Sequence, residues 1–290
     1  MRKFIFILLA LLPASLFAQN ETGSDAKSGD NDFGVWLELG ATKKLSKQWS
    51  IGVETELRMA DNVSQVGRFA LGGTVDFKPV NWLRLSTGYS WLYCHTFEKR
   101  KNTWDEDDPQ TLKNYKITPG YWSSKHRIRV EAAFQFPKLW NCIRISLRER
   151  YQYTWRSEFT TDRWKYRVFK HDTSIGGVDY KKGDLKPSTP DDPNPSLDPK
   201  VNEFESTHYL RSRVKVQLDK KRCHWSPFVS YELFNDLGSG FRVGKTRLSA
   251  GTGYSITKQH EVGLAYIFST EYDDVTDHAH IISLSYGFKF

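Results

Sequence analysis

Apolar and polar residues alternate along most of this chain. Residues 126–136 are an example, because every second residue is apolar and the residues between are mostly charged or polar. The apolar positions are Ile128, Val130, Ala132, Phe134 and Phe136. A period of two residues is typical of a β-strand with one apolar face. The final segment, HIISLSYGFKF, repeats the pattern and ends on Phe290.

Eleven segments carry this alternation, and most of them contain ten or more residues. They span approximately 33–42, 48–59, 67–78, 81–97, 126–136, 141–157, 207–219, 225–235, 243–257, 259–272 and 279–290. Soluble strands average about five or six residues, whereas a tilted strand that crosses a membrane needs about 9–11. The alternation therefore predicts an all-β fold, a transmembrane antiparallel up-and-down β-barrel at residues 33–290.

The number of strands is a difficulty for this prediction. Bacterial single-chain barrels have even numbers of strands. We therefore expect about twelve strands (10–12), with the twelfth in the N-terminal tail or in a long loop. The alternative is that residues 19–32 thread the lumen of the barrel.

The connections between the segments are of two kinds. FKPVN, FPKLWN, DKKRCH and ITKQ are short, whereas residues 98–125 and 158–206 form long loops. The second long loop contains KPSTPDDPNPSLDP, whose proline and aspartate residues predict an irregular, mobile segment. Short periplasmic turns and long extracellular loops are typical of outer-membrane barrels.

Residues 1–18 have the composition of a secretory signal peptide. Arg2 and Lys3 precede an apolar run at 4–12 that is too short to span a bilayer, and small residues predict cleavage after Ala18. A polar tail at 19–32 follows. We therefore expect export and a location in the cell outer membrane.

A soluble β-sandwich is the alternative fold, because its strands also alternate. It would have to bury large apolar residues from every strand, which would overfill one closed interior. The mean hydropathy of −0.58 is ordinary for a soluble protein, but only every second residue of a barrel strand faces lipid. The long strands and the loop asymmetry favour the barrel.

The net charge of +8 limits the partners of an exported chain. Nucleic acid is excluded by export, whereas anionic lipid and lipopolysaccharide fit a basic protein in the outer membrane. We expect a monomer. Cys94, Cys142 and Cys223 are expected to be packed free thiols, with a disulfide between Cys142 and Cys223 as the alternative in an oxidising compartment.

Several strand segments together resemble a known family. They are WLELGATKKLSKQWSIGVETELR, LRLSTGYSWLY, HRIRVEAAFQF, ISLRERYQY, SPFVSYELF and GKTRLSAGTGYSITKQHEVGLAYIF. These patterns are similar to outer-membrane proteins of the Bacteroidota in domain-of-unknown-function family 2490, over nearly all of residues 33–290. The resemblance implies an outer-membrane barrel without an assigned role. The terminal Phe290 also resembles the signal that delivers such proteins to the barrel-assembly machinery.

Charged residues lie at the positions that alternate with the apolar ones along the strands, which places them in the lumen. They are Arg58, Arg84, Arg127, Arg129, Arg144, Arg148, Arg150, Arg211, Arg213, Lys215, Arg247, Glu38, Glu54, Glu56, Glu131 and Glu232. A lipid-facing Arg or Lys at mid-bilayer would cost about 2–4 kcal/mol. Two interpretations are open: a salt-bridged plug, or a basic lumen that admits or binds anions.

One residue breaks this pattern. Glu149 lies on the apolar parity of the segment at 141–157. A β-bulge at this point, or an outer face covered by protein, would explain it.

We expect neither enzymatic activity nor a cofactor, because no complete catalytic or metal-binding set is evident. A lipid-modifying enzyme is the first alternative, since a His could activate a hydroxyl if an acid oriented it. His278, His280 and Thr270 share the lipid-facing parity near the extracellular boundary. A metal site of these His residues with Asp277 or Asp274 is also considered. Surface binding by the long loops is the second alternative.

Overall fold

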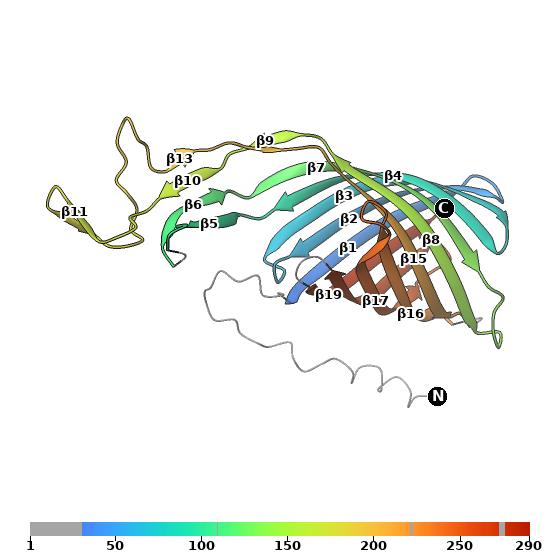
Figure 1. The fold of residues 1–290 in the computed structure, drawn as a ribbon. Coiled ribbons are helices and arrows are strands. Elements are labelled where there is room, and N and C mark those ends of the chain that lie inside the picture. Colours follow the sequence, from blue (N-terminus) through green and yellow to red (C-terminus); the bar gives the residue numbers. More distant parts are fainter. Residues whose placement is uncertain (1–30, 109, 221–222, 273–275) are drawn as a thin grey trace, which may run out of the picture.

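The computed structural model describes residues 31–108, 110–220, 223–272 and 276–290; the predicted signal peptide and tail residues 19–30 lie outside these ranges. All the secondary-structure elements in these ranges are β-strands, and eleven of them close into one barrel (Figure 1). The barrel strands are β1 (Asn31–Lys44), β2 (Trp49–Ala60), β3 (Gln65–Val80), β4 (Leu83–Thr96), β7 (Tyr121–Gln135), β8 (Ile143–Arg156), β15 (Glu205–Leu218), β16 (Trp225–Asp236), β17 (Arg242–Ser255), β18 (His260–Tyr272) and β19 (Thr276–Lys289). The predicted all-β barrel is confirmed, and each strand coincides with one predicted segment.

The barrel closes through a parallel pair of strands. β1 runs parallel to β19, with Val35 opposite Ile282, whereas the other neighbouring pairs of the barrel are antiparallel. An odd number of strands joined by hairpins leaves the first and last strands pointing in the same direction. Eleven lies within the expected range of 10–12, but the expectations of an even number and of a wholly antiparallel barrel are corrected. No twelfth strand joins the barrel within the described residues.

The two ends of the barrel differ. At the short-turn end, the strands are joined by residues 45–48, 81–82, 136–142, 219–224 and 256–259. At the long-loop end, residues 97–120 and 157–204 form the two longest connections. β1 begins at the long-loop end, and β19 finishes at the short-turn end.

The two long connections fold into strands of their own. β5 (Lys99–Trp104), β6 (Leu112–Thr118), β10 (Trp164–Arg167) and β13 (Ser196–Leu197) form one sheet, and β9 (Phe159–Thr161) pairs with β14 (Lys200–Asn202), as β11 (Thr173–Ile175) does with β12 (Val178–Tyr180). Figure 1 shows them as an arm that extends beyond the barrel. We call residues 97–120 and 157–204 the arm. Within the second loop, the segment KPSTPDDPNPSLDP is irregular as predicted except for β13, whereas the rest of the loop contains short strands that were not predicted.

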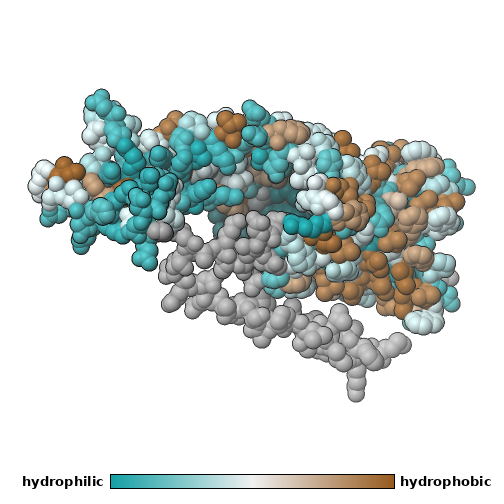
Figure 2. All heavy atoms as spheres, viewed as in Figure 1, coloured by the Kyte–Doolittle hydropathy of each residue, from teal (hydrophilic) through white to brown (hydrophobic). Residues whose placement is uncertain are grey.

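Side chains alternate between the outside and the inside of the barrel. Outward positions carry exposed apolar side chains such as Leu39 (58% exposed) and Val53 (57% exposed), whereas inward positions carry buried polar ones such as Glu131 and Arg148. Figure 2 shows apolar residues gathered over the barrel and hydrophilic residues over the arm. The closed barrel with an apolar exterior excludes the β-sandwich. Within the described ranges, no helix has the length and hydrophobicity needed to cross a membrane.

Glu149 faces outward without a bulge. It lies opposite Ala132 on β7 and Ser212 on β15, and the register of both strand pairs is regular. The Ser212 hydroxyl donates a hydrogen bond of 2.6 Å to its carboxylate. The interpretation of a β-bulge is therefore wrong.

The three cysteines are free thiols. Cys94 and Cys142 are half-buried, and Cys223 is exposed. The alternative of a disulfide between Cys142 and Cys223 is therefore wrong. Cys223 was expected to be packed, but it is exposed.

Candidate functional site: the charged lumen

The lumen contains a block of four arginines on two neighbouring strands. Arg150 on β8 lies opposite Arg211 on β15, and Arg148 lies opposite Arg213. Alternate residues of a strand share a face, so all four side chains project into the lumen. We call these residues the arginine block.

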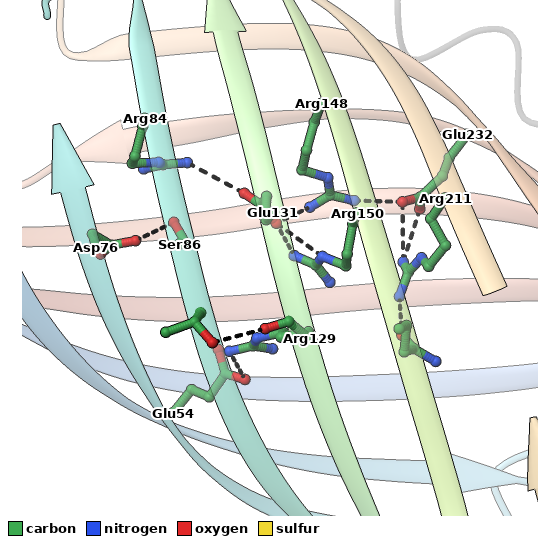
Figure 3. A network of polar contacts seen from close by, with 12 residues as sticks. Glu54, Asp76, Arg84, Ser86, Arg129, Glu131, Arg148, Arg150, Arg211 and Glu232 are labelled. Atoms are coloured by element: carbon green, nitrogen blue, oxygen red, sulfur yellow. Dashed lines mark hydrogen bonds and ion pairs between the residues drawn. The ribbon is translucent and has the colours of Figure 1, made fainter. Parts of the chain in front are cut away.

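Two carboxylates flank the arginine block, one on each side. Glu131 on β7 accepts hydrogen bonds of 2.8 and 2.6 Å from Arg150 and lies 3.8 Å from Arg148. Glu232 on β16 accepts hydrogen bonds from Arg148, and from Arg211 at 3.1 Å (Figure 3). Each carboxylate joins two arginines. The result is a continuous charge-assisted network across four strands, which rigidifies this wall of the barrel.

A second cluster surrounds Glu56 on β2. Glu56 accepts hydrogen bonds of 2.7 and 2.8 Å from Arg58 and one of 2.9 Å from Arg68 on β3. The Arg58 guanidinium also lies 3.4 Å from the ring centroid of Trp36 on β1, within cation–π distance. An inward aromatic ring is therefore packed against the charges of the lumen.

Two further ion pairs of the lumen involve Arg129 and Arg84. Arg129 on β7 lies 2.5 Å from Glu54 on β2, although β4 and β3 separate these strands. Arg84 on β4 lies 3.8 Å from Glu131 (Figure 3). The Arg129–Glu54 pair therefore bridges two strands from inside the lumen and occupies part of the central cavity.

Arg144 lies apart from these clusters, at the short-turn end. It forms an ion pair with Asp219, and Lys138 lies 2.9 Å from the same carboxylate. The hydrogen bond from Lys138 and the charge of Arg144 lower the pKa of Asp219 below its ordinary value.

Three arginines of the lumen have no carboxylate within ion-pair distance among the described residues. Arg127 donates a hydrogen bond of 3.3 Å to Thr154, and Arg247 donates one of 3.4 Å to Ser269. Arg213 makes no hydrogen bond or ion pair within the described ranges, and its Nε is buried. The positive charges of these side chains are available to a ligand or to water.

The charged side chains surround a central cavity of about 460 Å³. Its lining contains eight arginines and five glutamates, so its formal charge is 8 − 5 = +3. These residues are Arg58, Arg127, Arg129, Arg148, Arg150, Arg211, Arg213, Arg247, Glu38, Glu54, Glu56, Glu232 and Glu261. Water in this cavity therefore meets a net positive wall.

Other cavities adjoin the central one along the barrel. Towards the long-loop end, a cavity of about 750 Å³ shares Trp36, Arg58 and Arg247 with it. Towards the short-turn end, a cavity of about 300 Å³ shares Arg213 and other residues with it. A cavity of about 600 Å³ lies at the short-turn mouth, beside Arg84 and Phe290. The lumen therefore contains several cavities, two of which share lining residues with the central one.

Two residues of this site were not predicted from the sequence. Arg68 completes the cluster at Glu56, and Trp36 packs against Arg58. Both lie on inward parity, since Arg68 is two residues before Ala70 and Trp36 is two residues before Glu38. Strict use of the period-two pattern could have found both.

The residues considered for catalysis form pairs. Thr270 Oγ1 lies 3.2 Å from His278 Nδ1, and His280 Nδ1 lies 2.6 Å from the hydroxyl of Tyr266. Among the described residues, no carboxylate forms an ion pair with either His, and no three His, Cys, Asp or Glu side chains are grouped to hold a metal ion. Asp274 lies outside the described residues.

Residues 33–279 match a family model described as "Protein of unknown function (DUF2490)". The matched segment runs from β1 into β19 and so includes nearly the whole barrel. The chain belongs to this family. The resemblance to the family is thereby confirmed, and DUF2490 is represented here by a closed barrel with a charged lumen. A search of the curated proteins finds no match to the chain.

Proposed function

We propose that this DUF2490 protein is an outer-membrane β-barrel of a Gram-negative bacterium and forms a narrow pore that prefers anions. The uncompensated arginines of the central cavity are the observation that carries the proposal. Three guanidinium groups without a carboxylate partner line a compartment of net charge +3. Rings of Arg and Lys favour anions in pores, because they stabilise an anion that has lost part of its hydration.

The exterior of the barrel supports the membrane location. Apolar side chains are exposed on the strands of every wall, for example Leu71, Val130, Val229 and Leu284. An exposed apolar band of this extent on a closed barrel is the surface that lipid, rather than water, accommodates. A cleaved signal peptide, contact with lipopolysaccharide, delivery by the barrel-assembly machinery and a monomeric state complete the proposal.

The network of ion pairs supports a pore of low conductance. The pair Arg129–Glu54 occupies part of the central cavity, and Arg58 stacks on Trp36 where that cavity meets the 750 Å³ cavity. The protein is proposed as non-enzymatic, and the pair Thr270–His278 is assigned an interfacial role.

Single-channel recording in planar bilayers tests the proposal. With a KCl gradient across the membrane, we expect small conductance steps and a reversal potential with the sign of chloride permeation. Replacing Arg127 and Arg247 by Gln should shift the reversal potential towards cation permeation, because both residues line the central cavity without a carboxylate partner. The absence of steps, or a cation preference in the unaltered protein, would contradict the proposal.

A further inference from the structure

Four donor side chains lie together where the central cavity meets the 300 Å³ cavity. Lys215 on β15, Ser230 on β16 and Ser249 on β17 are directly opposite one another in one row. Arg213 lies two residues from Lys215 on the same face of β15, and directly opposite residues have Cβ atoms about 4.5–5.5 Å apart. We call these four residues the donor patch.

The two cations of the donor patch have no carboxylate partner. Arg213 makes no hydrogen bond or ion pair among the described residues, and its buried Nε is unpartnered. Lys215 Nζ lies 3.9 Å from the ring centroid of Phe228 and forms no ion pair in the same ranges. Both side chains are half-buried in the lumen, where a cation without a partner is costly, so these two groups favour the binding of an anion.

The two serines add neutral donors to the same place. Ser230 is 6% exposed, and Ser249 lines the same two cavities as Ser230 and Arg213. Neither hydroxyl makes a hydrogen bond within the described part of the chain. A hydroxyl can donate one hydrogen bond, and its hydrogen rotates towards an acceptor. The patch therefore offers ammonium, guanidinium and hydroxyl donors to a single ligand.

No carboxylate near the donor patch forms an ion pair with Arg213 or Lys215 among the described residues. Glu232, beside Arg213, is bound to Arg148 and Arg211. Glu261 accepts a hydrogen bond of 2.7 Å from Lys289. Glu38 on β1 lines the 300 Å³ cavity from the wall opposite β15, and it forms no ion pair with Arg213 or Lys215.

We propose that the donor patch binds one tetrahedral oxyanion, either inorganic phosphate or the phosphate group of a small phosphomonoester. Four donors that converge from three strands suit an acceptor with several oxygens better than a halide. The cavity of about 300 Å³ has room for a small phosphorylated molecule. The inference rests on the proposed function in one respect, since the anion reaches the patch through the lumen.

Thermal unfolding of the full-length mature protein in detergent tests this inference. Inorganic phosphate and glycerol 3-phosphate are titrated separately, with chloride added to keep the ionic strength constant. We expect a saturating rise of Tm with one or both phosphates, because a ligand that binds only the folded state stabilises it. The compound that binds with the larger affinity shows whether the site takes inorganic phosphate or the phosphate group of a phosphomonoester. No saturating rise with either compound would overturn the inference.

Variants assign the effect to the patch. Arg213→Gln and Lys215→Gln should each weaken the apparent affinity about tenfold, since a charge-assisted hydrogen bond contributes roughly twice as much as a neutral one. The double variant Ser230→Ala/Ser249→Ala keeps both charges and should weaken it less. Arg144→Gln is the matched control, because Arg144 is paired with Asp219 and lines neither cavity. Equal phosphate binding in all variants would overturn the inference.

The bilayer experiment separates this inference from the pore. An anion-selective barrel that binds no phosphate contradicts the donor patch alone. A barrel that binds phosphate through Arg213 and Lys215 but does not conduct contradicts the pore alone.

Discussion

Glu149 is the one carboxylate at an outward position of the described barrel strands. It lies between Leu147 and Tyr151 on β8, with Ala132 and Ser212 on the neighbouring strands. The Ser212 hydroxyl donates one hydrogen bond to the Glu149 carboxylate, which can accept about four hydrogen bonds. A charge at this place is destabilising if lipid surrounds it.

Replacing Glu149 by Leu should therefore stabilise the barrel in a bilayer by about 1–2 kcal/mol, somewhat less than the cost of a lipid-facing Arg. Guanidinium-induced unfolding of the protein in lipid vesicles measures the change. Glu149→Gln, which removes the charge and keeps the acceptor, should give part of the gain. A loss of stability in both variants would contradict lipid contact at this position.

Trp36 forms the junction between two compartments of the lumen. Its ring centroid lies 3.4 Å from the Arg58 guanidinium and 5.0 Å from that of Arg247, and all three residues line both the central cavity and the 750 Å³ cavity. Trp36→Ala should widen this junction and raise the single-channel conductance. Trp155→Ala removes an outward Trp from β8 and is the control, with conductance unchanged. Equal conductance in both variants would place the narrowest point elsewhere.

At the scale of the element, the ion pairs of Asp198 connect separate segments of the arm. The Asp198 carboxylate lies 2.7 Å from Lys116 on β6 and 3.0 Å from Arg163, which precedes β10. The interaction with Lys116, followed by that with Arg163, lowers the pKa of Asp198 below its ordinary value of 3.8. A carboxyl with a lowered pKa stabilises the folded arm above its unfolded pKa, and the effect is lost as the pH falls through the folded pKa.

Asp198→Asn should therefore loosen the arm at pH 5, and its difference from the parent protein should diminish as the pH falls below the ordinary pKa of the carboxyl. Pepsin digestion followed by mass spectrometry measures the rate of cleavage within residues 157–204. Comparison of the two proteins at each pH cancels the change in activity of the protease. We expect faster cleavage of the variant at pH 5 and a smaller difference between the two proteins at pH 2. A difference as large at pH 2 as at pH 5 would show that the charge of Asp198 is not the cause.

The arm and the barrel are separate elements. The short strands of the arm pair among themselves, and the barrel strands pair with one another. Replacing residues 160–200 by a short Gly/Ser linker should leave the barrel folded, since Arg156 at the end of β8 lies opposite Glu205 at the start of β15. Heat-modifiable migration in gels and strand content by circular dichroism check this result. An unfolded product would show that the arm is required for the barrel.

The difference between these elements explains what could be predicted from sequence. Barrel strands contain 12 to 16 residues, and over that length the alternation fixes both the strand and the face of each residue. Strands of the arm contain 2 to 7 residues and are interrupted by Pro and Asp, so periodicity carries little information there. Parity places Arg148 and Glu131 in the lumen, but their partners depend on side-chain geometry. The unpartnered state of Arg213 therefore became visible only in the structure.

At the scale of the whole molecule, the odd number of strands means that the barrel closes at a parallel pair of strands, which we call the seam. The parallel pair of β1 and β19 joins segments from the two ends of the chain, so the barrel cannot close before β19 is present. Phe290 lies at the end of this seam. Its amide donates a hydrogen bond of 3.0 Å to Thr42, and its carbonyl accepts one of 3.1 Å from Lys44. Both bonds use the main chain and are independent of the side chain.

The Phe290 side chain takes no part in these hydrogen bonds, so its role in assembly can be tested separately from the closure of the seam. It is 53% exposed and lies 5.3 Å from the Phe288 ring on the same outward face. Phe290→Ala should lower the amount of assembled barrel in cell envelopes severalfold, while the purified variant refolded in detergent keeps the stability of the parent protein. Phe288→Ala removes the same side chain two residues earlier and should assemble normally, because the Phe290 side chain is unchanged. If both variants assemble equally, or if Phe290→Ala is also unstable after refolding, the ring acts in the folded barrel and not as an assembly signal.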